Sequence, residues 1–483
     1  MKILELRNLL KNKISGDVFW DKDILKFYSV DSSLYQVIPK IVVIPKSEKD
    51  VITTIKFANK NKISVTPRGA GTGLVGNSLN EGIIIDLRNF DSIKIYKNIV
   101  EIGAGVQKGN LDKSLKKKKK FCSPNPSIGP YCAMGGIIGN NASGSKALKY
   151  GSTIENLIEI TFIDGKGKKI TLPHNQSIGQ KILKIAQKID ISKFPKVSKN
   201  SCGYRLDSVR SIRDTHRVLA GSEGTLGIIL SAKMRVRDIP KKRLLFIVEY
   251  PSIYRAAKDC LQINKSKPSG LEFVDRKTLK NFDHEFQRNT KCLLFVEYDS
   301  YLAEKNQAFE NLIDGNIVKK ITKEEEIEKW WKYRDLALSF SLKSIKFQDR
   351  IPHIIEDATI PLENLGRLFS LIEKTNKKFH TKTIMYGHAG NGNIHVRIIS
   401  KRKRLDLLDK ISKEYFDQVL KLGGTITGEH GDGIARSGYI PKQYGQRNFE
   451  SFLELKKFLD PNGILNPYKI TNHSNRLKKI EPM

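Results

Sequence analysis

The sequence contains few cysteines, and their spacing excludes two common uses of this residue. Only five occur among 483 residues: Cys122, Cys132, Cys202, Cys260 and Cys292. No C-x-x-C pair is present, so neither an iron-sulfur cluster nor a disulfide framework is indicated. We therefore expect reduced thiols in a cytosolic protein.

A long apolar run is also missing. No stretch approaches the ~18 to 20 apolar residues of a membrane-spanning helix. The first ten residues, MKILELRNLL, mix charges too early for a secretory signal, and Glu5 argues against a transit peptide. We expect a cytoplasmic protein whose only membrane contact would be peripheral, at the inner face.

Acidic residues are scarce relative to basic ones. The chain has 51 Asp and Glu against 85 Lys and Arg, which gives a formal net charge of +34. Such a field attracts anionic partners, whether small carboxylates, acidic proteins, anionic lipid or nucleic acid. The lysines are spread along the chain, apart from a block at 116–120 that ends a helix predicted from Leu111. We expect no specific nucleic acid, because the charge is not interleaved with aromatic residues and no nucleic-acid module is recognisable.

Glycine, by contrast, is abundant and clustered in the first half. A predicted strand over 41–44, a helix over 49–59 and a strand over 63–66 lead to PRGAGTGLVG, residues 67–76. Its glycines let backbone N–H groups approach a phosphate, and Arg68 and Thr72 add side-chain donors. The segment matches neither G-x-G-x-x-G nor the loop of nucleoside triphosphate-binding proteins.

Two further clusters of small residues lie at 134–144 (MGGIIGNNASG) and 220–229 (AGSEGTLGII). A run of small residues cannot build a side-chain core, but it lets main chain pack tightly against a flat cofactor. Three such clusters within about 200 residues are hard to explain as turns alone.

Two segments of the second half combine glycine with histidine. We expect His388 in a turn with three glycines, and His395 on a strand over 394–399 whose side chains alternate between two faces. A helix predicted over 405–422 and a short strand over 425–427 lead to GEHGDG, residues 428–433. His388, His395 and Glu429 could form a two-histidine, one-carboxylate metal triad that leaves His430 free for proton transfer. Two histidines alone are more often structural.

Together these segments resemble a flavoprotein family. Residues 67–76, 123–144, 199–204 (KNSCGY) and 221–227 are similar to the FAD domain of vanillyl-alcohol-oxidase-type flavoproteins. Residues 386–395, 428–433 and 459–468 resemble the C-terminal half of the FAD-linked D-2-hydroxy-acid dehydrogenase branch, which includes D-lactate, glycolate and D-2-hydroxyglutarate dehydrogenases. The likeness covers about residues 35 to 470 in the same order.

The resemblance implies an α+β fold, with a two-part FAD-binding domain, an α+β ferredoxin-like cap domain and a C-terminal segment that returns to the FAD domain. We expect an N-terminal helix and linker over 1–34, the FAD-binding domain over 35–238, the substrate or cap domain over 239–425 and the C-terminal segment with the catalytic motif over 426–483. The near copies LLFIVEY (244–250) and CLLFVEY (292–298) indicate duplicated strand-helix-strand units in an antiparallel sheet.

The resemblance also implies which residues form the site. The flavin is expected to be non-covalent, because residues 67–76 include no histidine or cysteine. Its implied contacts are Arg68, Gly69, Gly71, Thr72, Gly73, Gly76, Ser127, Gly135, Gly136, Asn141, Gly144, Glu223, Ile228 and Asn466. A divalent metal, zinc or manganese, is implied at His388, His395 and Glu429, with His430 as the catalytic base.

An arginine near two tryptophans is the implied grip for the substrate carboxylate. Arg334 lies on a predicted helix beside Trp330 and Trp331, where residue type alone would suggest a snorkelling surface side chain. Relatives that oxidise D-2-hydroxyglutarate carry a threonine, a lysine and an asparagine where this chain has Leu338, Ile355 and Arg397. The second dicarboxylate anchor is therefore open, and Arg397 is the candidate replacement.

The implied reaction is oxidation of a small anionic D-2-hydroxy acid to the 2-oxo acid. Without cluster cysteines, we expect electrons to pass to a separate iron-sulfur subunit or another external acceptor. The alternatives are an oxidase that uses oxygen and, in a different class, a basic nucleic-acid-binding protein. A flavin-holding subunit with a dead site is disfavoured, because all four metal and base residues are present.

Overall fold

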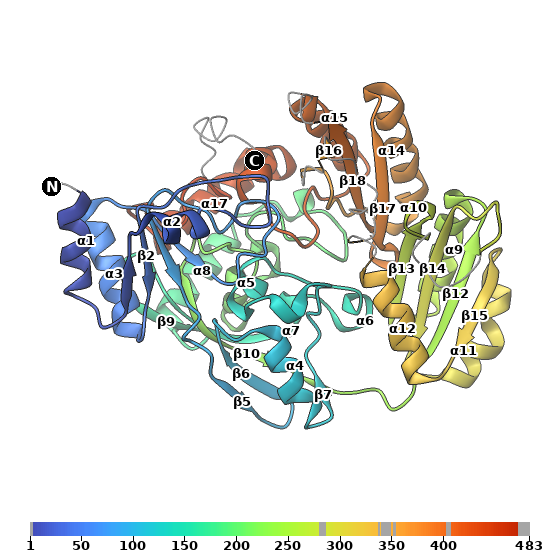
Figure 1. The fold of residues 1–483 in the computed structure, drawn as a ribbon, viewed down its shortest axis with the longest axis horizontal. Coiled ribbons are helices and arrows are strands. Elements are labelled where there is room, and N and C mark those ends of the chain that lie inside the picture. Colours follow the sequence, from blue (N-terminus) through green and yellow to red (C-terminus); the bar gives the residue numbers. More distant parts are fainter. Residues whose placement is uncertain are drawn as a thin grey trace.

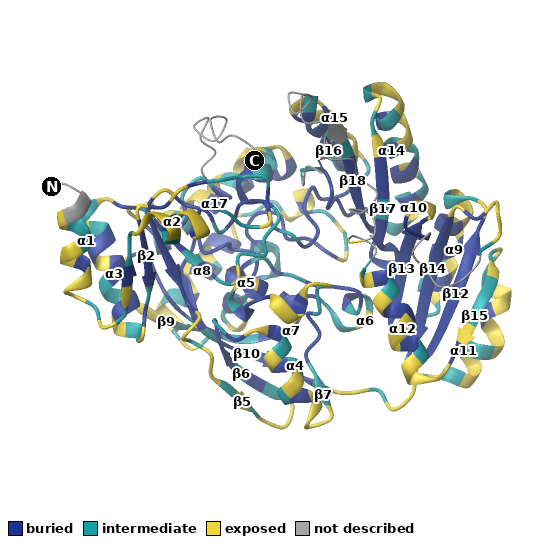
Figure 2. Cartoon of the chain, viewed as in Figure 1, coloured by how far each residue is buried: buried dark blue, intermediate teal, exposed yellow. Residues whose placement is uncertain are grey.

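The computed structural model describes residues 3–279, 286–336, 339, 349–350, 354–401 and 407–471. The first half of the chain forms two sheets with their helices at the left of Figure 1, and a larger sheet with its own helices stands at the right. Figure 2 shows that the strands of both parts are largely buried, while exposed surface is concentrated on helices and connecting segments. Leu338 lies outside the described residues.

The first sheet belongs to the N-terminal part. Its elements are α1 (Ile3–Lys11), β1 (Asp17–Phe19), α2 (Lys22–Tyr28), β2 (Ile41–Ile44), α3 (Glu48–Asn61), β3 (Val65–Arg68) and β4 (Ile83–Asp86). The strand order is β1-β2-β4-β3, in which β2 and β3 run parallel to β4. β1 adds an antiparallel edge to β2. The predicted N-terminal linker is therefore wrong in part, because it supplies a strand of this sheet.

The second sheet is antiparallel and completes the two-part first half. Its strand order is β5-β6-β10-β8-β9. The elements of this part are β5 (Ile93–Ile95), β6 (Ile99–Gly103), α4 (Lys108–Lys116), β7 (Lys120–Phe121), α5 (Met134–Gly139), α6 (Ala147–Tyr150), α7 (Thr153–Asn156), β8 (Leu157–Ile163), β9 (Lys169–Leu172), α8 (Gln176–Ala186), β10 (Ile228–Arg235) and β11 (Arg237–Asp238). β7 and β11 pair with each other in a separate two-stranded sheet. α4 ends at Lys116, so the lysine block lies at a helix end as predicted.

The cap sheet has seven strands. Its elements are β12 (Leu244–Tyr250), α9 (Ile253–Lys265), β13 (Gly270–Asp275), α10 (Arg276–Leu279), β14 (Cys292–Tyr298), α11 (Leu302–Ala308), β15 (Asn316–Ile321), α12 (Glu324–Asp335), β16 (Asp349–Arg350), α14 (Leu365–Phe379), β17 (Lys382–His388), β18 (Asn393–Lys401) and α15 (Leu408–Lys421). The order is β15-β12-β14-β13-β17-β18-β16. The two near-copy segments form β12 and β14, which pair antiparallel, and each begins a strand-helix-strand unit as predicted, β12-α9-β13 and β14-α11-β15.

Successive side chains of the cap strands point alternately into two hydrophobic clusters. Phe246 and Val248 point into the main hydrophobic cluster, whereas Leu245 and Ile247 join a smaller one with Trp330 of α12. Because both faces of these strands are covered, their sequences read as continuous apolar runs.

The C-terminal segment returns to the first half, as predicted. It contains α16 (Gly433–Arg436) and α17 (Ile440–Leu459), and α17 packs against α8. Val65 of β3 donates to Ile464 O at 2.8 Å and accepts from Asn466 N at 2.7 Å. The short strand predicted over 425–427 is wrong: Thr425 makes only an isolated bridge with Thr359, and the backbone that follows bonds a carboxylate instead. Among the described residues, no helix is long and apolar enough to cross a membrane.

Candidate active site

A cavity lies where the glycine-rich segments of the first half face the ends of β17 and β18. Its empty volume, counted to the open mouth, is about 1630 Å³. The first half contributes Pro67 to Leu74, Ser127, Gly135, Gly136, Ser143, Gly144 and Glu223 to its wall; the second half contributes Tyr386, His388, His395, Arg397, Glu429 and His430. The segments predicted to hold a flavin and the residues predicted to hold a metal therefore share one cavity.

The 67–76 loop brings bare main chain to this wall. Gly71 has φ +70°, and a Cβ there would lie 2.3 Å from Arg68 Nη2, so only glycine fits without displacement. Arg68 donates to Val30 O at 2.7 Å and to Tyr28 O at 3.3 Å. The guanidinium thus ties the loop to the carbonyls of residues 28 and 30. It also gives the cavity wall a positive charge.

Ten of the fourteen predicted flavin contacts line the cavity, and four lie behind the wall. Asn141 accepts from Ile154 N at 2.9 Å, and Asn466 donates to the carbonyls of Asn77 and Glu223 at 2.8 and 2.6 Å. Gly76 sits against Ile434, and Ile228 is buried at the start of β10, between the wall residues Gly227 and Ile229. These four residues support the main chain of the wall.

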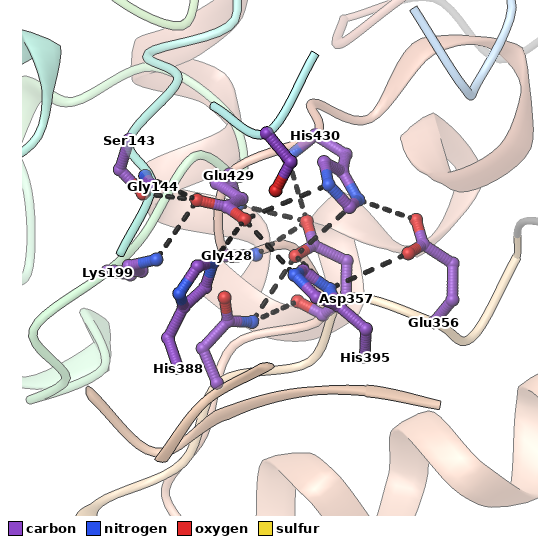
Figure 3. A network of polar contacts seen from close by, with 12 residues as sticks. Ser143, Gly144, Lys199, Glu356, Asp357, His388, His395, Gly428, Glu429 and His430 are labelled. Carbon is purple, nitrogen blue, oxygen red and sulfur yellow. Dashed lines mark hydrogen bonds and ion pairs between the residues drawn. The ribbon is translucent and has the colours of Figure 1, made fainter. Parts of the chain in front are cut away.

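The predicted metal residues converge. His388 and His395 come from the paired strands β17 and β18, and Glu429 Oε1 lies 2.9 Å from His388 Nε2 and 3.2 Å from His395 Nε2 (Figure 3). The prediction that His388 lies in the turn is wrong, since it is the last residue of β17. In the turn that follows, Gly392 has φ +68°, and a Cβ there would lie 2.0 Å from Ile360 O. Only glycine fits at this position.

Glu429 is held from both sides. Its Oε2 accepts from Ser143 Oγ, from Gly144 N at 3.1 Å and from Lys199 Nζ at 3.0 Å. Burial alone would raise the pKa of Glu429, but Lys199 and the two histidines hold it well below its usual value. Asp357 Oδ2 accepts the backbone N–H groups of Gly428, Glu429 and His430 at 3.0, 2.9 and 2.8 Å, which fixes the loop.

The donor set fits a divalent metal. Burial lowers the pKa of His395 to about 4, so at neutral pH its imidazole is in the neutral form that ligates metals. Its Nδ1 is buried without a hydrogen-bond partner among the described residues and lies 3.8 Å from Glu356 Oε2 and 3.9 Å from Asp357 Oδ1. A ligating histidine ordinarily directs its other nitrogen at such a carboxylate.

An alternative set of ligand atoms lies close by. One atom from each of Asp357, His395, Glu429 and His430 falls within 4.8 Å of the others. In this set Asp357 would offer Oδ1, because its Oδ2 accepts three backbone N–H groups, and His430 would offer Nε2, because its Nδ1 lies 2.8 Å from Glu356 Oε1. The two sets share His395 and Glu429.

His430 is the histidine most open to the cavity. Its side chain is 21% exposed, against 3% for His388 and 5% for His395. Its Nε2 stands 3.8 Å from Glu429 Oε1, beyond hydrogen-bond distance. Burial would lower the pKa of His430, but Asp357 and Glu356 outweigh it and raise the pKa above its usual value.

Arg334 lies directly behind residues of the cavity wall and is not among the residues that line the cavity. It is 1% exposed, forms a close ion pair with Glu272 and donates to Ser127 Oγ at 3.3 Å. Glu272 Oε1 in turn lies 2.8 Å from His388 Nδ1. Burial alone would raise the pKa of Glu272, but Arg334 and His388 hold it at about 2. Arg334 is therefore neither a snorkelling surface residue nor part of the wall; it supports the carboxylate that orients His388.

Arg397 is the arginine that the second half of the chain contributes to the cavity wall, opposite Arg68 from the first half. Its Nε donates to Tyr386 Oη at 3.2 Å, and its Nη2 lies 3.4 Å from Glu356 Oε2. Glu356 also bonds Arg436 Nη2 at 2.6 Å. Sequence reasoning missed the roles of Glu272, Glu356, Asp357, Lys199 and Ser143. Lys199 lies in the KNSCGY segment of the resemblance, but Glu272 gives no signal within the apolar strand GLEFVD.

Comparison with known proteins agrees with this arrangement. Two family models match the sequence: the FAD binding domain over residues 39–173, and the C-terminal domain of FAD linked oxidases over residues 239–470. The chain is 27% identical to the D-2-hydroxyglutarate dehydrogenase of Pseudomonas putida, over 99% of this chain and 53% of that protein. It is also 27% identical to the glycolate oxidase subunit GlcD of Bacillus subtilis, over 92% of this chain and 91% of that one.

A third relative is the mitochondrial D-lactate dehydrogenase (cytochrome) of Arabidopsis thaliana, at 26% identity over 96% of this chain and 80% of that protein. The chain thus spans about half the length of the D-2-hydroxyglutarate dehydrogenase it matches and most of the other two. Among solved structures, an alkyldihydroxyacetonephosphate synthase superposes with a TM-score of 0.69 at 18% identity, covering 97% of this chain and 85% of that one. This likeness concerns the fold, and it confirms the predicted two-part α+β architecture.

Proposed function

We infer the activity from the premise that this chain belongs to the FAD-linked oxidases, whose FAD-binding and C-terminal domains it contains. We propose that it is an FAD-dependent dehydrogenase that oxidises a small D-2-hydroxy acid, of the D-lactate, glycolate or D-2-hydroxyglutarate class, to the 2-oxo acid. The names of its relatives support that substrate class. One observation carries the proposal: the glycine-lined wall and the cluster of His388, His395, Glu429 and His430 share one cavity.

The main chain of residues 69–73, 135–136 and 143–144 would hold the flavin along one side of this cavity. FAD, when bound, supplies the two-electron acceptor for the substrate. The protein contributes the orientation of the reacting carbon and the exclusion of water. Gly69 also has no room for a side chain, since its Cβ would lie 2.9 Å from Ala133 Cβ.

His388, His395 and Glu429 would hold a divalent ion, zinc or manganese, at the other side. Such an ion lowers the pKa of a coordinated hydroxyl and orients the neighbouring carboxylate. His430 is placed to take the hydroxyl proton on Nε2, because its Nδ1 is occupied by Glu356. Glu356 then stabilises the positive charge that forms on the ring, and its own pKa, which burial would raise, is held well below its usual value by Arg397, His430 and Arg436.

Arg397 supplies the cation that faces a substrate carboxylate in this cavity. Arg397 lines the cavity while pairing with Glu356 at 3.4 Å, whereas Arg334, which pairs with Glu272, is not among the lining residues. A carboxylate in contact with Arg397 gains a charge-assisted hydrogen bond in a site from which water is largely excluded. The acceptor of the electrons would be a separate iron-sulfur subunit or a soluble carrier that approaches the positive surface.

The proposal is tested by the visible spectrum of the purified holoprotein under anaerobic conditions, before and after addition of D- and L-lactate, glycolate and D- and L-2-hydroxyglutarate. Bleaching of the flavin by a D-enantiomer or by glycolate is expected, and the L-enantiomers should leave the spectrum unchanged. A flavin that no member of the panel reduces would overturn the proposed reaction. Subsequent admission of air separates a dehydrogenase from an oxidase, since reoxidation within a single turnover time would favour oxygen as the acceptor.

A further inference from the structure

The two oxygens of the Glu429 carboxylate face different parts of the molecule. Oε1 faces the Nε2 atoms of His388 and His395, which belong to the cap sheet. Oε2 is surrounded by donors from the first half of the chain (Figure 3). We call Ser143, Gly144 and Lys199, which supply these donors, the Glu429 clamp.

The clamp belongs to the flavin wall. Ser143 and Gly144 line the cavity in which the flavin is expected. Asn125 N donates to Ser143 O at 2.8 Å, and a Cβ on Gly144, whose φ is +124°, would lie 2.2 Å from Asn125 O. The main chain there has no room to shift toward residue 125. Lys199 is 1% exposed, so its ammonium is committed to the interior.

The cap side contacts only one of the two carboxylate oxygens of Glu429, Oε1. The cap fixes the backbone of residues 428–430 through Asp357, but the described donors to Oε2 all come from the first half. A carboxylate on a fixed backbone still has freedom about its side-chain torsions, and a metal ligand that must first be ordered binds more weakly. The first half therefore supplies the order that the metal site needs.

We propose that the Glu429 clamp positions Glu429 for metal binding, and that flavin binding and metal binding are coupled through it. This inference rests on the proposed metal site. A flavin packed on Ser143 and Gly144 stiffens the clamp, so metal binds more tightly to the flavin-loaded protein. Because coupling is reciprocal, metal-loaded protein must hold flavin more tightly by the same factor, typically 5- to 150-fold.

The test uses the holoprotein. FAD retention is measured by dilution and filtration for protein loaded with Zn²⁺ and for protein stripped by a chelator, and Zn²⁺ affinity is measured separately by competition with a chromophoric chelator. Removal of Zn²⁺ from the wild type should weaken FAD binding at least about 5-fold. Ser143→Ala should weaken Zn²⁺ binding by about 10- to 100-fold, as loss of an outer-shell partner does, and should shrink the effect of Zn²⁺ on FAD retention.

Ser78→Ala is the matched control. Ser78 also lines the cavity, but its hydroxyl donates to Asp31 at 3.2 Å, so its loss should leave the effect of Zn²⁺ on FAD retention at the wild-type value. Stoichiometric Zn²⁺ binding with equal FAD retention in both states, or an unchanged Zn²⁺ affinity in Ser143→Ala, would overturn the coupling and leave the metal site standing. A holoprotein that binds no Zn²⁺, Mn²⁺ or other divalent ion would instead overturn the metal site itself, and the coupling with it.

Discussion

Replacement of Arg397 by methionine separates the two arginines that the substrate could use. In the structure Arg397 belongs to the cavity wall, whereas Arg334 forms a buried pair with Glu272. A hydrogen bond to a charged group contributes about 1.5 to 3 kcal/mol. Its loss in the transition state should lower kcat/KM by about 10- to 150-fold, because each ~1.4 kcal/mol corresponds to a factor of ten.

The same variant should fold, because Glu356 is not left without a cation. Arg436 Nη2 remains 2.6 Å from Glu356 Oε1, and His430 Nδ1 remains at 2.8 Å. Arg334→Met differs in this respect: it removes the guanidinium partner of the fully buried Glu272 and leaves it only the His388 imidazole, which should reduce the free energy of unfolding by about 3 to 5 kcal/mol. Urea unfolding of both variants, with flavin and metal content measured in each, separates loss of substrate contact from loss of structure.

The assay is kcat/KM for glycolate, D-lactate and D-2-hydroxyglutarate with an artificial electron acceptor. An equal loss on all three in Arg397→Met places the guanidinium on the reacting carboxylate, and a loss confined to D-2-hydroxyglutarate places it on the distal one. Wild-type kcat/KM for all three would refute the role of Arg397. An Arg334→Met variant that keeps its stability and metal content but loses turnover would return the substrate contact to Arg334.

Three further predictions concern the base, the flavin loop and an ion pair between the two parts. His430→Ala should retain flavin and metal but lose about 100- to 10,000-fold in kcat, measured under saturating substrate; a loss of only a few-fold would exclude it as the base. Gly71→Val should be purified largely without flavin, as seen in its absorbance ratio, because the added Cβ would lie 2.3 Å from Arg68 Nη2. Burial would raise the pKa of Glu297, but Lys146 and Arg243 lower it, so its contribution to stability is complete above the unfolded pKa of about 4.3 and is lost as pH falls through the lower folded value. The difference in unfolding free energy between wild type and Glu297→Gln should therefore be constant above about pH 5 and shrink below about pH 4; a difference that grows in acid would contradict the pairing.

Helices and strands were predicted well where the apolar residues follow the period of a helix or a strand. The alternation of 394–399 lies within β18, and the helix predicted over 49–59 lies within α3. The glycine clusters could be assigned to a cofactor wall because the absence of side chains is itself visible in a sequence. A cofactor wall of this kind uses main-chain N–H groups, so it can be predicted without knowing which side chains meet in the fold.

The partners of the buried charges could not be predicted. Glu272 precedes His388 by 116 residues, and Lys199 precedes Glu429 by 230. In a strand such as GLEFVD, a glutamate is ordinarily assigned to a solvent-facing position, and an arginine beside tryptophans to the surface. Only the packing of α12 against the cap sheet brings Arg334 to Glu272, and this packing depends on contacts far apart in the sequence.

The buried ion pairs also bear on which substrates the proposed site would accept. Around His388 and His395 lie five carboxylates, Glu272, Asp335, Glu356, Asp357 and Glu429, and four cationic groups, Lys199, Arg334, Arg397 and Arg436, each with an opposite charge within 3.5 Å among its contacts. Because each of these charges is already paired, a divalent ion bound there would add two positive charges to a low-dielectric site, which is costly unless anions accompany it. A 2-hydroxy acid supplies one negative charge in its carboxylate and a second when its hydroxyl loses its proton, whereas a 2-hydroxy amide lacks the first. Under the proposed function, this local pairing of charges would select acids, whereas the surface charge of +34 would act on how often an anion arrives rather than on which anion reacts.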